Sequence, residues 1–277
     1  MAGGTRFNRC GRLTLDTIQY LLGALSGGVV GFTLGLVGGG GSILAVPLMV
    51  YLVGVASPHV AIGTSALAVA ANAASGLAQH ARAGTVKWRC GFLYAGSGVM
   101  GAIAGSTLGK AIDGQKLLFL FALLMLVVGA LMLRGRNNVG IDGAACNRHN
   151  APQVLGYGLG TGSFSGFFGI GGGFLIVPGL IASTQMPILN AVGTSLVAVT
   201  AFGLTTALSY AASGLVDWTL AAIFIAGGIF GGMAGTRAAQ RLSSRGALTT
   251  IFAALVFAVA AYMLFRSASV LLSGDIA

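Results

Sequence analysis

Two glycine-rich runs carry the groups best suited to bind an anion. They read GGGGSILAVP from Gly38 to Pro47 and GIGGGFLIVP from Gly169 to Pro178. Consecutive glycines interrupt a helix and free backbone N–H groups. Such groups, at the start of the next helix, attract negative charge. The predicted anion contacts are Gly39, Gly40, Gly41, Ser42, Ile170, Gly171, Gly172 and Gly173. The alternative for each run is a tight helix crossing that needs small residues.

A Gly-Thr-Ser tripeptide follows each run, and its hydroxyl groups are the next candidates. We predict that Thr64, Ser65, Thr194 and Ser195 donate hydrogen bonds to an oxyanion at no cost in buried charge. The alternative is that each hydroxyl bonds its own helix backbone. Asn72 adds an amide further along the first of these segments. His80, close behind it, is either an interfacial residue or a proton carrier.

The acidic and cysteine residues do not favour an enzyme, a metal site or a bound cofactor. The five acidic residues, all aspartates, fall at segment ends or in loops, and no metalloprotease or P-loop motif is present. Cys10, Cys90 and Cys146 are widely spaced and odd in number. We therefore expect neither a disulfide framework nor a metal site from them.

Composition indicates which elements position these groups. Hydrophobic residues make up 56% of the chain and charged residues only 7%, against about 25% charged in soluble domains. Several apolar runs are long enough to span a bilayer, which predicts an all-α polytopic membrane protein. The net charge of +10 is assigned to topology signals and anionic lipid rather than to nucleic acid. The run at 17–37 is too long for a signal peptide core, so it is expected to be a retained first helix.

The chain repeats itself. Gly40 recurs as Gly171 and Gly63 recurs as Gly193, with a period of about 130 residues. A proline, a tryptophan and the Gly-Thr-Ser tripeptide recur in the same order, which composition bias does not produce. We predict two transmembrane repeats of about 130 residues, at 17–133 and 154–266, joined by a polar linker at 134–153.

The number of crossings depends on what the glycine runs do. If each run joins two pieces into one broken crossing, the chain crosses eight times, and ten Lys and Arg against five favour cytoplasmic termini. If the pieces on either side of each run cross separately, the chain crosses ten times, the repeats are inverted, and nine against six put the termini outside. We therefore expect 8 to 10 membrane segments and leave the repeat orientation open.

Glycines also recur at every fourth position. They occupy positions 23, 27, 31 and 35, then 101, 105 and 109, then 227, 231 and 235. This spacing forms a groove on a helix where a second backbone can approach closely. We predict that these glycines pack helices together, and some of them could also widen a pathway.

The doubled motif resembles that of a known family. The glycine run, the Gly-Thr-Ser helix and a G-x-V-x-W turn, at Gly84–Trp88 and Gly214–Trp218, look like the signature of the TauE/SafE sulfite exporters, also called toluene sulfonate uptake permeases. The resemblance spans about residues 17–266.

This resemblance implies a multi-pass permease of the bacterial inner membrane that moves small sulfur-containing anions, such as sulfite, thiosulfate or sulfoacetate. We expect one anion site between the two glycine breaks, near the membrane midplane. The alternatives are a permease or channel for another small solute and a non-transporting assembly factor. Association into a homo-oligomer is left open.

Overall fold

The described part of the chain is entirely helical. The computed structural model describes residues 17–134, 146–147, 150–169, 173–242, 257 and 259–265, and no strand occurs among them. Four of the described helices are long and apolar enough to cross a membrane, at Ile18–Leu36, Pro58–Arg82, Ile188–Ala211 and Trp218–Ala238. Shorter apolar helices cover Gly41–Leu52, Gly114–Val127 and Leu175–Thr184. These lengths and compositions fit the predicted polytopic membrane protein.

The first half runs from α1 to α5. Helix α1 (Thr17–Val37) leads into the 3₁₀ helix η1 (Gly38–Leu44), the short α2 (Ala45–Pro47) and the π-helix η2 (Leu48–Leu52). Three longer helices follow, namely α3 (Pro58–Arg82), α4 (Trp88–Lys110) and α5 (Gly114–Arg134). Ser57 caps α3, because its Oγ accepts a hydrogen bond from the Val60 N–H.

The second half runs from α6 to α9. Its helices are α6 (Ala151–Phe168), α7 (Gly173–Thr184), α8 (Ile188–Ala211) and α9 (Trp218–Leu242). Gly169 ends α6 in the left-handed conformation, with φ of 67°, and its N–H donates to the Ser165 carbonyl. Helical residues continue at 259–265.

The chain reverses its direction across each glycine run. A Cβ added to Gly41 would overlap the backbone of Thr33 and Leu34, and one added to Gly54 would lie 3.6 Å from Gln19 Nε2. The segment after Gly38 therefore runs back along α1. A Cβ on Gly179 would lie 3.7 Å from Thr161 Cγ2, so α7 runs back along α6 in the same way. The pieces on either side of each run are thus antiparallel and do not continue in one straight line.

Glycine grooves pack helices of different halves against each other. On α1, a Cβ at Gly27 or Gly31 would overlap the backbone of Phe224 or Gly228 on α9. On α4, a Cβ at Gly105 would overlap the backbone of Ser163 on α6. Each pair is parallel, because residue numbers rise together along both helices. The predicted role of these glycines in helix packing is confirmed.

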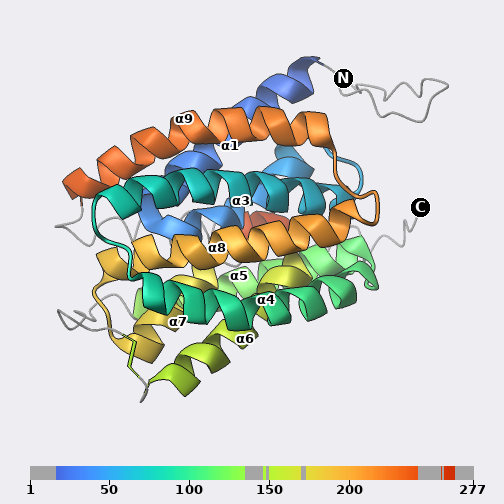
Figure 1. The fold of residues 1–277 in the computed structure, drawn as a ribbon. Helices are drawn as coiled ribbons and strands as arrows, with labels where there is room; N and C mark the ends of the chain where they lie inside the picture. The colour runs from blue at the N-terminus through green and yellow to red at the C-terminus, as the bar shows by residue number, and fades with distance from the viewer. Residues whose placement is uncertain are drawn as a thin grey trace.

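The α3–α8 pair lies at the centre of the fold. Figure 1 shows α9, α3, α8 and α4 following one another across the molecule. Helices α3 and α8 are antiparallel, because Gly63 lies beside Tyr210 while Gly76 lies beside Leu196. Helix α9 also packs on α3, and α4 also packs on α8. The predicted repeat would relate the α3–α9 contact to the α8–α4 contact. The duplication itself stays a prediction.

Candidate functional site

The first Gly-Thr-Ser tripeptide holds the turn that precedes α9. The backbone N–H of Asp217 donates to Thr64 Oγ1 at 2.9 Å. A Cβ on Gly63 would overlap the Leu215 carbonyl oxygen and lie 3.2 Å from Val216 Cγ2, so only glycine admits the turn there. We call these residues, Gly63, Thr64, Leu215, Val216 and Asp217, the Gly63 cluster. It joins the Gly-Thr-Ser tripeptide of one half to the G-x-V-x-W turn of the other.

The second Gly-Thr-Ser tripeptide holds the turn that precedes α4, at the opposite end of the α3–α8 pair. The backbone N–H of Lys87 donates to Thr194 Oγ1 at 2.9 Å. A Cβ on Gly193 would lie 2.7 Å from Thr85 Oγ1 and 3.3 Å from His80 Nδ1. His80 Nδ1 is itself 3.0 Å from Thr85 Oγ1. We call these residues, Gly193, Thr194, His80, Thr85 and Lys87, the Gly193 cluster.

The serines of both tripeptides bond their own helices. Ser65 Oγ donates to the Ile62 carbonyl at 3.0 Å, and Ser195 Oγ donates to the Val192 carbonyl at 2.7 Å. Both side chains are fully buried, as are those of Thr64 and Thr194. The structure thus engages all four predicted hydroxyl groups with backbone. The two threonine hydroxyls act as acceptors and keep a proton to donate.

The structure describes the first glycine run and the two ends of the second. Gly39, Gly40, Gly41 and Ser42 belong to η1, which packs on α7 and α8. Gly169 lies against α3, since a Cβ there would overlap Ile62 Cγ2, one residue before Gly63. Gly173 is the first residue of α7. The predicted contacts Ile170, Gly171 and Gly172 lie outside the described residues.

The two threonines of the predicted site lie far apart. Thr64 of the Gly63 cluster and His80 of the Gly193 cluster both belong to α3. At about 1.5 Å per residue, the two clusters are about 24 Å apart along this helix. One small anion therefore cannot contact Thr64 and Thr194 together. The anion site at the glycine breaks itself stays a prediction.

Asn72 lies midway between the two clusters and is only 4% exposed. Neither its Oδ1 nor its Nδ2 has a hydrogen-bond partner among the described residues. Its amide occupies the space beside Gly228 of α9 where another residue would have its Cβ, since a Cβ there would overlap Nδ2. The ring of Phe202 fills the matching notch at Gly98 of α4. Burying an unpaired amide costs free energy, so apolar packing alone does not explain this side chain.

Two interactions in the structure were not predicted from the sequence. Thr161 Oγ1 of α6 donates to Tyr94 Oη of α4 at 2.9 Å, which places two buried hydroxyls beside α7. Cys90 and Cys146 form a disulfide with a Cα–Cα distance of 5.3 Å, which corrects the expectation of no disulfide framework. The pairing joins the first turn of α4 to the linker just before α6. It follows from the parallel packing of these two helices, which the spacing of cysteines does not reveal.

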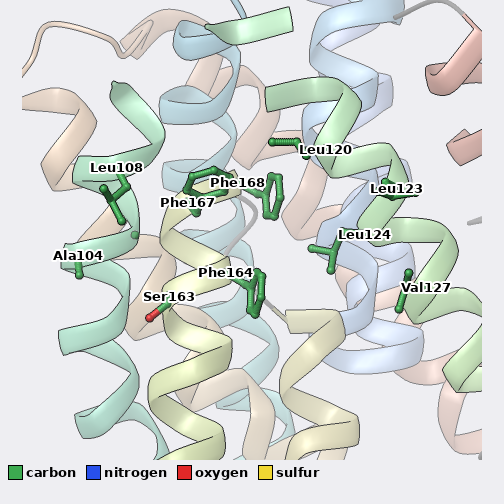
Figure 2. Close-up of a pocket in the computed structure, with 11 residues that line it drawn as sticks. Ala104, Leu108, Leu120, Leu123, Leu124, Val127, Ser163, Phe164, Phe167 and Phe168 are labelled. Carbon is green, nitrogen blue, oxygen red and sulfur yellow. The ribbon is translucent and has the colours of Figure 1, made fainter. Parts of the chain in front are cut away.

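An apolar groove opens between α5 and the α4–α6 pair. It has a volume of about 480 Å³ and is lined by side chains such as Leu120, Leu124, Phe164 and Phe167. Figure 2 shows three phenylalanines of α6 between the leucines of α4 and α5. The Ser163 hydroxyl at its edge already donates to the Leu159 carbonyl. This lining suits hydrocarbon rather than a hydrated ion, and none of the predicted site residues contributes to it.

Comparison with known proteins agrees with this architecture. The family model for the sulfite exporter TauE/SafE matches residues 23–263. A "probable membrane transporter protein" of Xylella fastidiosa (strain 9a5c) is 54% identical over 259 residues, covering 91% of this chain and 97% of that protein. The "probable membrane transporter protein YunE" of Bacillus subtilis (strain 168) is 28% identical over 250 residues, covering 82% and 90%. No solved structure matches the chain significantly. The chain therefore belongs to the sulfite exporter TauE/SafE family and is a membrane transporter, not an enzyme.

Proposed function

We propose that this transporter is a permease or exporter for a small sulfur-containing anion, such as sulfite, thiosulfate or an organosulfonate like sulfoacetate. The family assignment supports transport, and the buried unpartnered amide of Asn72 is the observation that favours an anion pathway through α3. The bacterial relatives favour the plasma membrane of a bacterium as its location, with multiple crossings.

The Asn72 amide supplies what an oxyanion needs in the interior of a membrane protein. Its NH₂ group offers two donors and carries no charge, so it replaces water without a buried ion of its own. Along α3 it lies about 12 Å from the level of each cluster. An anion that moves between the two ends of α3 would then pass Asn72 midway.

The distribution of acidic side chains supports an anion over a cation. The two aspartates in the described residues, Asp113 and Asp217, each accept a hydrogen bond from backbone N–H groups at the start of a helix. They lie at helix ends rather than along a path. A cation permease would be expected to hold carboxylates inside its spans.

The membrane potential is sufficient to drive export. A potential of 100 mV, negative inside, favours outward movement of each negative charge by about 2.3 kcal/mol. Uptake of the same anion would need a coupled proton or cation. Direction and driving force are therefore measurable together.

Flux in proteoliposomes tests the proposal. We expect labelled sulfite, thiosulfate or sulfoacetate to move in a saturable manner that follows an imposed potential of either sign. Asn72→Asp should reduce this flux at least tenfold, because a carboxylate in the path repels the anion. The control is Gln115→Glu, which adds the same charge at the start of α5 and should leave flux unchanged.

The alternatives predict different results. Flux of a metal cation or of a neutral solute, without anion flux, would indicate a permease of another class. Folded protein that carries none of these solutes would refute transport of this substrate class and favour an assembly role.

A further inference from the structure

A second group of polar side chains lies beyond the Gly63 cluster, where α3 begins and α4 and α8 end. Lys110 of α4 directs its Nζ to the Ser209 carbonyl at 3.2 Å and to Ser213 Oγ at 3.1 Å. Ser106, one turn earlier, donates its hydroxyl to Ser209 Oγ at 3.0 Å. The Lys110 ammonium also lies 5.9 Å from the centre of the Tyr210 ring. A cation thus lies at the end of the α3–α8 pair where α3 begins. We call this end, around Lys110, the Lys110 mouth.

Three polar atoms of α3 and α8 at this end of the pair have no hydrogen-bond partner among the described residues. The Tyr210 hydroxyl and Thr206 Oγ1 are on fully buried side chains of α8, one turn apart and so on one face. The Nδ1 atom of His59 on α3 is also buried and unpartnered, and its ring centre is 6.4 Å from that of Tyr210. Such groups in a folded protein normally bond water, an ion or a ligand.

We propose that these residues form a binding site for an oxyanion at this mouth, separate from Asn72. Two hydroxyls supply donors, and Lys110 supplies charge and its third N–H. The only aspartates near this end within the described residues, Asp113 and Asp217, are engaged by the backbone N–H groups that begin α5 and α9. A site of this composition accepts negative oxygens and disfavours cations.

Capping of α8 does not account for the whole arrangement. Lys110 next to the last carbonyls of α8 is a common way to end a helix. That role leaves the Tyr210 hydroxyl and Thr206 Oγ1 unexplained, because neither forms a hydrogen bond with the ammonium or with a carbonyl of the described residues. A buried hydroxyl without a partner costs free energy that an apolar side chain would not cost. The two hydroxyls are therefore accounted for only if something bonds them.

The opposite end of the α3–α8 pair carries a different set of residues. When Gly63 is matched with Gly193, the same register matches Tyr210 with His80, Thr206 with Gly76, and Lys110 with Gln240. The mouth with Lys110 therefore differs chemically from the other mouth. We assign it to loading of the anion, a role that rests on the proposed permease function, whereas binding itself does not.

Equilibrium binding of labelled thiosulfate to the full-length protein in detergent tests the site. Lys110→Gln should weaken binding about tenfold, and Lys110→Arg should restore most of it. Lys116→Gln removes a charge at the same end and should bind as the wild type does. Tyr210→Phe keeps the ring, removes only the hydroxyl and should weaken binding several-fold, so it carries the test if Lys110→Gln fails to fold.

The outcomes are distinguishable from those for transport. Binding that is unchanged in Lys110→Gln and Tyr210→Phe, or no binding by the wild type, would overturn the site. Binding that depends on Lys110 in a protein that moves no anion would support the site and refute the permease. In a transporting protein, we expect Lys110→Gln to raise the half-saturating concentration about tenfold with a smaller change in maximal flux.

Discussion

Replacing Thr64 and Thr194 with valine separates a structural from a substrate-binding role of the Gly-Thr-Ser tripeptides. Valine matches threonine in shape and removes only the hydroxyl. In the structure, each hydroxyl accepts the N–H of the residue before a long helix, Asp217 before α9 and Lys87 before α4. We therefore expect each substitution to loosen the start of the helix that the threonine holds.

The magnitude follows from the environment of each bond. A buried N–H left without a partner costs about 1–3 kcal/mol, and interhelical side-chain hydrogen bonds in membranes average about 0.6 kcal/mol. Both bonds are only partly buried, so water can replace part of each. We expect a loss of about 1 kcal/mol for Thr64→Val and the same for Thr194→Val. The two sites are about 24 Å apart, so the double variant should lose about 2 kcal/mol.

The assay is reversible unfolding in mixed detergent, with anion flux measured on the same variants well below their unfolding midpoints. Thr64→Ser and Thr194→Ser retain the acceptor and serve as controls that should unfold close to the wild-type midpoint. Equal stability of Thr64→Val and wild type would refute the structural role. A tenfold rise in the half-saturating anion concentration without loss of stability would instead assign the hydroxyls to the substrate.

Three further predictions concern packing, the disulfide and a turn. On α6, Gly162→Leu should lower the free energy of unfolding by more than about 3 kcal/mol, because the leucine side chain would overlap the Gly98 backbone of α4. The control is Gly160→Leu, which has nothing within 4 Å of its Cβ and should elute as folded protein in size-exclusion chromatography. In protein denatured without reductant, a maleimide should add no mass at Cys90 or Cys146, and both should react after reduction; labelling of either before reduction would contradict the pairing. Gly84→Ala should lower stability in thermal denaturation by about 1 kcal/mol through backbone conformation alone, because φ is 69° and no atom lies within 4 Å of the added Cβ.

The packing of the helices could be predicted from the sequence because it depends on a local pattern. Glycines four residues apart, such as Gly27 and Gly31, define a groove on one helix whatever lies opposite. The pattern does not name the partner, and the pairing of α1 with α9 across nearly the whole chain emerges only in the structure.

The serines of the tripeptides bond their own helices, which was one of the two predicted alternatives. The role of the threonines could not be predicted, since the partners of Thr64 and Thr194 are distant in sequence. Asp217 lies 153 residues from Thr64, and Lys87 lies 107 residues from Thr194. From the sequence alone, the foreseeable partners of each hydroxyl are its own helix or a ligand. The repeat held a further signal, because the Gly-Thr-Ser tripeptide and the G-x-V-x-W turn recur together and each of them meets the other motif of the opposite half.

The disulfide and the count of Lys and Arg residues predict opposite orientations of the α3–α8 pair in the membrane. With ten segments, nine Lys and Arg on the side of the Gly193 cluster place that end in the cytoplasm. The Cys90–Cys146 disulfide belongs to the same end, and disulfides persist in oxidising compartments outside the bacterial cytoplasm. A margin of nine to six is small, whereas a reducing compartment opens a disulfide whatever the charge of the loops. We therefore expect the Gly193 end to face outside, so that the Lys110 mouth opens to the cytoplasm, the side from which the membrane potential expels an anion.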